Sequence, residues 1–251
     1  FDLGQPPLVR LRAVETGPAR HLILFDIHHI AADGASLQLL LGEFAALYNG
    51  PEPPAVHLRY RDYSQWLLAR DLSRAPAYWT QVFYGELPVL DLPADHPRPA
   101  RQTYGGAVVK AQGDAALQER VTALARNTGA TVYMVLLAAL MTTLHKYSRQ
   151  EDIVVGSPAS GRTHRDTEGV PGMFAGTLAM RGKHAKDKTF SAFLAALRES
   201  CWLAYENQEY PFEDLVEAVN VTRDLSRDPV FDVMLALQNN QEGDVTLDGV
   251  A

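Results

Sequence analysis

The strongest constraint on the fold is a short apolar run at residues 22–27 that leads directly into the segment His-His-Ile-Ala-Ala-Asp-Gly at 28–34. The run reads Leu-Ile-Leu-Phe-Asp-Ile, which predicts a buried β-strand. Successive side chains of a strand point to opposite faces, so His28 and His29 do not face the same pocket. One imidazole is therefore available for chemistry at the end of the strand, while the other packs or forms hydrogen bonds.

The residues after the histidines predict a loop that meets a helix N-terminus. Gly34 has no Cβ, so the backbone there can approach a substrate closely or take a left-handed turn, and Asp33 could brace the loop. Leucines and a phenylalanine recur at three- and four-residue steps over 37–47, which predicts an amphipathic helix with Ser36 or Asp33 as its N-cap and the segment 49–51 as its stop. Free N–H groups at a helix N-terminus favour a developing oxyanion, so the arrangement is typical of an acyl-transfer site.

Other interpretations of the paired histidines remain open from the residues themselves. Histidines at a strand end also serve as hydrogen-bonded structural groups or as metal ligands. A zinc site is disfavoured, because adjacent histidines on opposite strand faces do not chelate one ion and no Cys/His set at ligand spacing follows. We therefore expect no metal here.

Composition excludes several classes of function. A hydrophobic content of 47% supports a proper core, and 251 residues suffice for one large or two modest domains. The net charge of −7 argues against a nucleic-acid surface. The lone Cys201 cannot form an internal disulfide, which predicts a cytoplasmic protein with Cys201 as a small buried side chain. The chain opens without a signal-peptide pattern, and its longest apolar run, 132–144, is too short to span a membrane.

Periodicity and turn signals divide the rest of the chain into elements. Residues 8–12 and 21–27 flank a turn at 15–18 and predict a hairpin. The further predicted helices are 60–72, 114–126, 131–147, 190–205 and a short one from Pro211 to Val219, and the further predicted strands are 106–110, 153–156 and 230–237. A proline-rich stretch at 92–101 reads as a linker. The predicted organisation is a first lobe at 1–91, a connector at 92–105 and a second lobe at 106–251.

Five separated segments occur in the order found in one family. They are HHIAADG at 28–34, YRDYSQW at 60–66, PGMFAGTL at 171–178, YPFEDLV at 210–216 and RDLSRDPVFD at 223–232. Together they resemble the condensation domains of nonribosomal peptide synthetases, and the resemblance covers essentially the whole chain. It implies an α/β, chloramphenicol-acetyltransferase-like two-lobed sandwich. The elements that the family has before residue 1 and after residue 251 have no counterpart, so we expect an internal fragment that is incomplete at both ends.

The resemblance also implies a reaction and its partners. The family joins two thioester-bound acyl groups: the free amine of the acceptor attacks the thioester carbonyl of the donor, and an amide forms. Both substrates are delivered on the 4'-phosphopantetheine arms of peptidyl carrier proteins, which enter a tunnel between the lobes from opposite ends. A neighbouring adenylation domain is implied as a further partner. No covalently bound cofactor, nucleic acid or membrane is expected.

The catalytic residues implied by the resemblance all lie in the histidine motif. His29 accepts the ammonium proton or orients the amine. Asp33 forms a salt bridge with an arginine of the second lobe, for which Arg162 is the matching candidate and Arg165 the runner-up. Gly34 brings its backbone N–H close to the substrate.

The remaining site residues are implied as supports or as parts of the channel. His28 is expected to be structural. Ser36, Gly172, Met173 and Gly176 are candidates for the substrate channel, and Gly176 stands where the family commonly has asparagine.

Several alternative functions stay open at this stage. Within the superfamily, heterocyclisation domains carry aspartates where His28 begins the motif, and epimerisation domains usually have a different run after Asp33, so both fit less well. Stand-alone acyltransferases share only the HxxxDG pattern. A non-catalytic module of the same fold that docks carrier proteins or recruits partners is the alternative from a different class.

Overall fold

The described residues form two compact units. A computed structural model describes residues 1–52, 55–71, 73–103, 105–185, 187–220, 224–238 and 246–249. Unit 1 contains Phe1–Arg70 and Ser160–Ala175 together with the described residues 246–249, and unit 2 contains Asp71–Ala159 and Gly176–Gln238. This division differs from the predicted lobes, because Trp79 and Phe83 of the stretch 71–91 are buried in the core of unit 2. The lobe boundaries of a whole domain stay a prediction.

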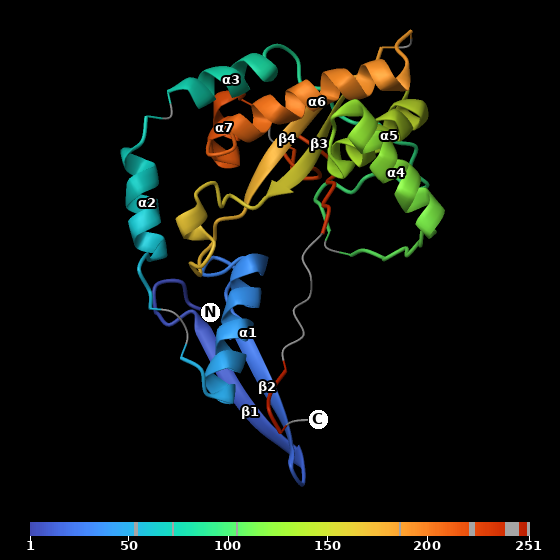
Figure 1. Ribbon diagram of the computed structural model, residues 1–251. Helices are drawn as coiled ribbons and strands as arrows, with labels where there is room; N and C mark the ends of the chain where they lie inside the picture. Colours follow the sequence, from blue (N-terminus) through green and yellow to red (C-terminus); the bar gives the residue numbers. More distant parts are fainter. Residues whose placement is uncertain are drawn as a thin grey trace. The chain divides into compact units, whose positions relative to one another are not determined.

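Unit 1 begins with the predicted hairpin. Strands β1 (Val9–Gly17) and β2 (Arg20–Ile27) pair antiparallel, with Val9 opposite Ile27 and a register shift between Glu15 and Gly17 (Figure 1). The expectation that 22–27 is a buried strand is wrong: its leucine, isoleucine and phenylalanine side chains over 22–25 are 39% to 50% exposed. An apolar strand becomes buried only where another layer packs on it, and in the described part of the chain β1 and β2 pair only with each other.

Helix α1 (Gly34–Asn49) follows the histidine loop as predicted. Its N-cap is Asp33, whose Oδ1 accepts a hydrogen bond of 2.8 Å from the Ser36 backbone N–H. The helix ends at Gly50, which has a φ of 109° and donates its N–H to the Ala46 carbonyl. The predicted stop at 49–51 is confirmed, and of the two N-cap candidates, Ser36 and Asp33, the structure has Asp33.

Helix α2 (Tyr60–Ala69) and the segment 160–175 form a small core of their own in unit 1. Tyr63, Val170 and Phe174 are buried there, with Leu58 and Leu67 packed against them. The segment contains one short 3₁₀ helix, η1 (Arg165–Thr167). Helix α2 ends before the predicted boundary at residue 72, which itself lies outside the described residues. A stretch about a hundred residues later in the sequence thus packs on α2.

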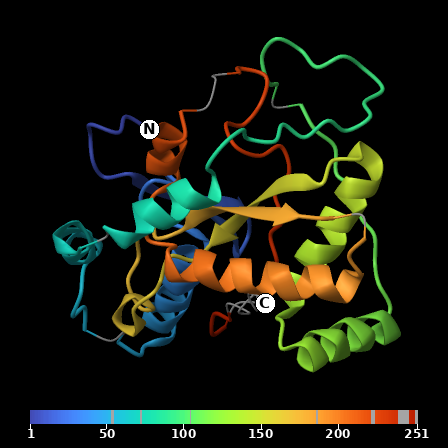
Figure 2. The same ribbon diagram turned by 90° about the horizontal axis from the view of Figure 1, so that it is seen from above.

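Unit 2 is built on two antiparallel strands and five helices in its described residues. Strands β3 (Asp152–Ala159) and β4 (Gly176–Lys183) pair with Asp152 opposite Lys183 and Ala159 opposite Gly176. The helices are α3 (Arg74–Val82), α4 (Ala115–Thr128), α5 (Val132–Ser148), α6 (Phe190–Glu206) and α7 (Phe212–Ala218). Helix α6 runs alongside β4 (Figure 2).

The main core of unit 2 lies between α5, α6 and the two strands. Met134, Leu137 and Met141 of α5 are at most 1% exposed and belong to the same core as Phe193 of α6. Cys201 is fully buried in this core, as predicted, and burial raises the pKa of its thiol to about 12. The predicted helix at 131–147 is confirmed by α5, and the structure buries it in the core of unit 2.

Two predicted strands of unit 2 are wrong and two elements were not predicted. Residues 106–110 have no regular structure, and Val108 and Val109 are exposed. Within 230–237 a single β-bridge joins Met234 to Gly156. The Phe231 ring packs against Gly156 in the space that a side chain there would need. Helix α3 and strand β4 lack a clear local signal. A strand needs a partner for its backbone groups, and a short apolar pattern does not supply one.

The predicted connector has no regular secondary structure in its described residues. The stretch 92–101 contains no helix or strand, as expected for a linker, and Tyr104 of the predicted connector lies outside the described residues. No single helix in the described parts of the chain is long and apolar enough to cross a membrane. Helices α4 and α5 reach that length and composition only as a pair bent by 103°.

Candidate functional site

The two imidazoles of the histidine loop have different surroundings. The His28 N–H donates to the Leu8 carbonyl at 3.0 Å, and its ring Nδ1 accepts from the Ile30 N–H at 3.1 Å. The ring also meets the Phe1 ring edge-on, with 5.8 Å between centroids. His29 is exposed in the turn that follows β2. His28 is thus occupied within its own loop, whereas the His29 imidazole is accessible.

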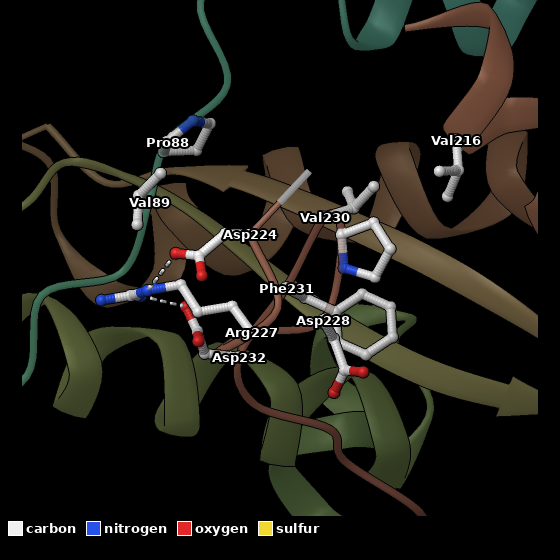
Figure 3. A pocket seen from close by; sticks show the side chains of 10 residues that line it. Pro88, Val89, Val216, Asp224, Arg227, Asp228, Val230, Phe231 and Asp232 are labelled. Atoms are coloured by element: carbon white, nitrogen blue, oxygen red, sulfur yellow. Dashed lines mark hydrogen bonds and ion pairs between the residues drawn. The ribbon is translucent and has the colours of Figure 1, made fainter. Parts of the chain in front are cut away.

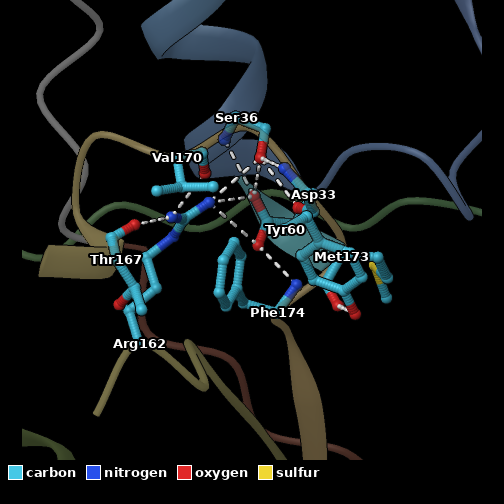
Figure 4. A network of polar contacts seen from close by, with 9 residues as sticks. Asp33, Ser36, Tyr60, Arg162, Thr167, Val170, Met173 and Phe174 are labelled. Atoms are coloured by element: carbon cyan, nitrogen blue, oxygen red, sulfur yellow. Dashed lines mark hydrogen bonds and ion pairs between the residues drawn. The ribbon is translucent and has the colours of Figure 1, made fainter. Parts of the chain in front are cut away.

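Asp33 lies at the centre of a buried network of polar contacts (Figure 4). The residue is 4% exposed. Its Oδ1 lies 2.7 Å from the Ser36 hydroxyl and accepts from the Arg162 guanidinium at 3.1 Å, and its Oδ2 accepts from the Phe174 N–H at 3.1 Å. Both carboxylate oxygens therefore have donors, which is what a buried charge requires.

Arg162 is the arginine that pairs with Asp33, as the resemblance implied. Its side chain is 8% exposed. The guanidinium also donates to the carbonyls of Thr167 and Val170, the latter at 2.8 Å, and its central carbon lies 4.1 Å from the centroid of the Phe174 ring. The runner-up, Arg165, is exposed in η1. The pair ties the start of α1 to the segment 160–175.

Two residues predicted to line the substrate channel belong to this network instead. Ser36 is fully buried, and its Oγ lies 2.8 Å from the Gly172 carbonyl and accepts from the Gly172 N–H at 2.9 Å. The Asp33 N–H also donates to the Gly172 carbonyl, at 3.1 Å. The structure corrects the prediction for both residues, because a side chain or backbone with all its polar contacts inside the protein is a support for the motif.

Tyr60 is a member of the site that the sequence did not single out. Its hydroxyl donates to the Met173 carbonyl at 2.7 Å, and its ring occupies the space that a side chain at Gly172 would need. Met173 is partly buried beside it, and Gly176 is exposed as the first residue of β4. Only the match of segment 60–66 to the family pointed to this region. A channel role for Met173 and Gly176 stays a prediction.

The charge of Asp33 is stabilised by its surroundings. Burial raises the pKa of this carboxyl group, but the hydrogen bonds from Ser36 and Arg162 and the Arg162 charge outweigh burial, so the pKa is lowered from 3.8. Burial and the Asp33 charge raise the pKa of Tyr60. Asp33 is therefore a fixed carboxylate at neutral pH, which suits a brace better than a proton carrier.

Gly34 begins helix α1 and does not take the left-handed turn that the sequence suggested. Gly34 is not one of the glycines that have a positive φ in the described part of the chain. A Cβ at this position would meet nothing within 4 Å, and the residue is exposed. The open space leaves room for a substrate to approach the backbone. In the described residues, no group of three or more His, Cys, Asp or Glu side chains is placed to hold a metal ion.

The last of the five segments, 223–232, lines a cavity in unit 2. This cavity of about 320 Å³ is lined by Val89, Val216 and residues of 224–232 (Figure 3). Arg227 lies between Asp232, at 2.7 Å, and Asp224, at 3.9 Å. The arginine also donates to the Leu90 carbonyl at 2.9 Å. These contacts hold the segment against the stretch before the connector, and residue 223 of the segment lies outside the described part.

Comparison with known proteins places the chain in a family. Residues 1–249 match the family model described as condensation domain. Tyrocidine synthase 3 of Brevibacillus parabrevis is 45% identical over 246 residues, which cover 96% of this chain and 4% of that protein. The chain spans between 4% and 10% of the length of such curated relatives.

Solved structures agree with the family match. A holo four-domain nonribosomal peptide synthetase bound to AMP and glycine superposes with a TM-score of 0.83 at 27% identity, over 96% of this chain and 19% of that one. The complex of the X-domain and OxyB from teicoplanin biosynthesis gives a TM-score of 0.83 at 26% identity, over 93% of this chain and 55% of that one. The chain therefore belongs to the condensation-domain family of nonribosomal peptide synthetases, with its chloramphenicol-acetyltransferase-like α/β fold.

Proposed function

We propose that this chain is the part of a condensation domain that carries the catalytic histidine for peptide-bond formation. The donor is an acyl or peptidyl thioester and the acceptor is an aminoacyl thioester, each on the phosphopantetheine arm of a carrier protein. The acceptor amine attacks the donor thioester carbonyl, a C–N bond forms, and the C–S bond breaks. The donor carrier leaves as a thiol with the proton that the amine loses. The observation that carries this proposal is the exposed His29 next to a buried Asp33–Arg162 brace.

In this proposal His29 acts on the acceptor amine. It accepts the ammonium proton or holds the amine towards the thioester. A positioned base contributes about 10²- to 10⁴-fold, and fixing two tethered reactants can contribute as much. Asp33 acts through the loop that it holds, and Gly34 offers a backbone that a substrate can reach because no atom lies near its missing Cβ.

The proposed partners are a donor carrier domain, an acceptor carrier domain and a neighbouring adenylation domain. The four-domain synthetase among the similar structures and the peptide synthetases among the relatives support this setting. We further propose that the product is an antibiotic or siderophore peptide and that it is assembled in the cytoplasm.

The test is dipeptide formation from two loaded carrier proteins by the full-length synthetase that contains this chain. We expect His29→Ala to lower the rate by about 10²-fold or more. His21→Ala is the matched control, because His21 is an exposed histidine on β2, the strand that leads to His29. Dipeptide formation at the parental rate by His29→Ala would remove His29 from the mechanism. The same assay on the 251-residue chain shows whether it is active without the rest of the synthetase.

A partner-recruiting module of the same fold is the second candidate. It is favoured by one observation, the similar structure of an X-domain in complex with OxyB. Under this alternative the unaltered full-length protein forms no dipeptide, and the domain still binds a partner protein. An unaltered protein that forms dipeptide, together with an inactive His29→Ala variant, excludes it.

A further inference from the structure

Unit 1 contains a small cavity that the proposed reaction does not use. Its volume is about 200 Å³, and Leu58, Asp62, Tyr63, Trp66, His164 and Asp166 line it. Three of these residues come from the segment 60–66 in α2. This segment is one of the five that carry the family resemblance, and it has no role in the proposed chemistry. The others come from the stretch before α2 and from the segment 160–175.

Aromatic rings form much of the wall of this cavity. The centroids of Tyr63 and Trp66 are 5.8 Å apart, and those of Trp66 and His164 are 6.2 Å apart. The face of an indole ring attracts cations. The Arg70 guanidinium carbon lies 4.6 Å from the centroid of the Trp66 ring, so one face of the indole already holds a cation, and Arg70 is not among the residues that line the cavity.

The charged groups at the cavity are negative. Asp62 and Asp166 line it, and no lysine or arginine does. Asp62 uses Oδ2 to accept a hydrogen bond of 3.0 Å from the Arg59 N–H, and Asp166 is 74% exposed with its Oδ2 3.6 Å from the His164 ring. Two carboxylates beside an indole face are complementary to a cationic group. Leu58 adds an apolar surface for an aliphatic stem.

The size and the hydrogen bonds narrow the choice of cation. Pockets for drug-sized ligands measure about 300–1,000 Å³, so about 200 Å³ suits a single side chain. Arginine prefers a carboxylate with both oxygens free for its fork, whereas Asp62 Oδ2 already accepts a hydrogen bond and Asp166 Oδ2 lies 3.6 Å from the His164 ring. A lysine ammonium is a compact point charge that can reach two separate carboxylates.

We propose that this cavity binds a lysine side chain of a partner polypeptide segment. The ammonium lies at the Trp66 ring between Asp62 and Asp166, and the methylene stem packs on Leu58 and Tyr63. The setting of the family supplies further polypeptide from which such a segment can come, because the chain covers only 4% to 10% of the length of its synthetase relatives. The proposal does not depend on the reaction assigned to His29.

The test is a ligand-observed NMR titration of the 251-residue chain with a short acetylated and amidated Gly-Lys-Gly peptide. The comparison peptide carries norleucine, which keeps the stem and lacks the ammonium. We expect the lysine peptide to bind about tenfold more tightly than the norleucine peptide, and added salt to reduce this difference. Equal affinity of the two peptides overturns the proposal. Binding of n-butylammonium without binding of the lysine peptide also overturns it, because the site would then take free amines only.

Two variants locate the binding in the cavity. Trp66→Leu keeps an apolar side chain without the indole face, and we expect the dissociation constant to rise about fivefold or more. The matched control is Trp202→Leu, which removes an exposed tryptophan of α6 in unit 2. Asp166→Asn changes an exposed side chain that the fold does not need, and we expect a rise of about two- to fivefold, against none for Asp95→Asn in the connector. Unchanged binding in both cavity variants overturns the proposal.

Discussion

Removing the Arg162 side chain is the sharpest test of how the histidine motif is held. Arg162→Met keeps an unbranched side chain of similar length and removes every donor of the guanidinium. The variant loses the contacts to Asp33 at 3.1 and 3.4 Å, the bond to the Ser36 hydroxyl at 3.0 Å and the bonds to the carbonyls of Thr167 and Val170. Asp33, which is 4% exposed, keeps only its contacts to Ser36 and to the backbone.

The expected cost follows from an unpaired buried charge. Breaking a buried ion pair by removing one partner costs about 3–5 kcal/mol, and each carbonyl left without a donor costs about 1–3 kcal/mol unless water reaches it. We expect Arg162→Met to lower the free energy of unfolding by about 3–5 kcal/mol, because relaxation of the loop offsets part of the carbonyl cost. Domains are typically stable by about 5–15 kcal/mol, so this is a large share.

The pH dependence of this cost has a definite sign. In the parent the pKa of Asp33 is lowered from 3.8, so its contribution to stability is present above 3.8 and is lost as the pH falls through the folded-state pKa. Without Arg162, the pKa of Asp33 rises relative to the parent, because the hydrogen bond and the charge of the guanidinium no longer lower it. Protonation of Asp33 then removes less stability from the variant than from the parent. The difference between parent and variant therefore shrinks on acidification.

Urea unfolding followed by circular dichroism measures both quantities. With urea m-values of about 1–3 kcal/mol per molar, we expect the midpoint at neutral pH to fall by about 1–5 M, and by less at about pH 4. Asp33→Asn combined with Arg162→Met should be more stable than the single Arg162→Met variant, because the buried charge is gone. A midpoint within about 0.3 M of the parent at neutral pH, or a difference that grows on acidification, would refute this reasoning.

Three further outcomes follow from single positions. Gly34→Ala should lower dipeptide formation in the full-length protein while the free energy of unfolding stays the same or rises by up to about 1 kcal/mol, because a Cβ there is free of clashes and alanine favours the helix. Gly161→Ala should unfold unit 1, since Gly161 has a φ of 64° and its Cβ would overlap a backbone carbonyl; limited proteolysis detects this. Acidification should lower the melting temperature through His184: burial and the neighbouring His145 lower the pKa of His184 from 6.5, so its contribution to stability is present above 6.5 and is lost as the pH falls.

Each of these outcomes has a control. For Gly34→Ala, unchanged dipeptide formation removes the proposed close approach of substrate at this position. Gly169→Ala is the match for Gly161→Ala, because a Cβ at Gly169 meets nothing within 4 Å; equal protease resistance of the two variants would contradict the prediction. His184→Gln should melt with a weaker dependence on acidic pH than the parent, and an identical dependence would assign the effect to another group.

The sequence determined the elements whose signals are local. The sequence offered Asp33 as one of two N-cap candidates and the segment 49–51, which contains Gly50, as the stop, because capping involves groups within about one helical turn. The burial of α5 and Cys201 followed from runs of apolar residues. The hairpin and the order of the five family segments were equally readable. Each of these features depends on neighbours in sequence.

The tertiary structure decided what each element contacts. The apolar residues of β2 are exposed because no further layer covers them in the described part of the chain, and 106–110 is not a strand because it has no pairing partner. Ser36 and Gly172, expected at a channel, are buried supports, which no local pattern could show for residues 136 positions apart.

The histidine motif shows both sides of this division. The sequence of the motif, together with the family resemblance, predicted His29 as the reactive group. The resemblance also predicted Arg162 as the partner of Asp33. The tertiary structure showed that this pair is buried, although its residues are 129 positions apart in sequence. It also showed the contacts of Ser36, Tyr60 and Phe174 around the pair. Spacing along a chain fixes which groups a motif offers, whereas burial and hydrogen-bond partners depend on which distant segments pack together.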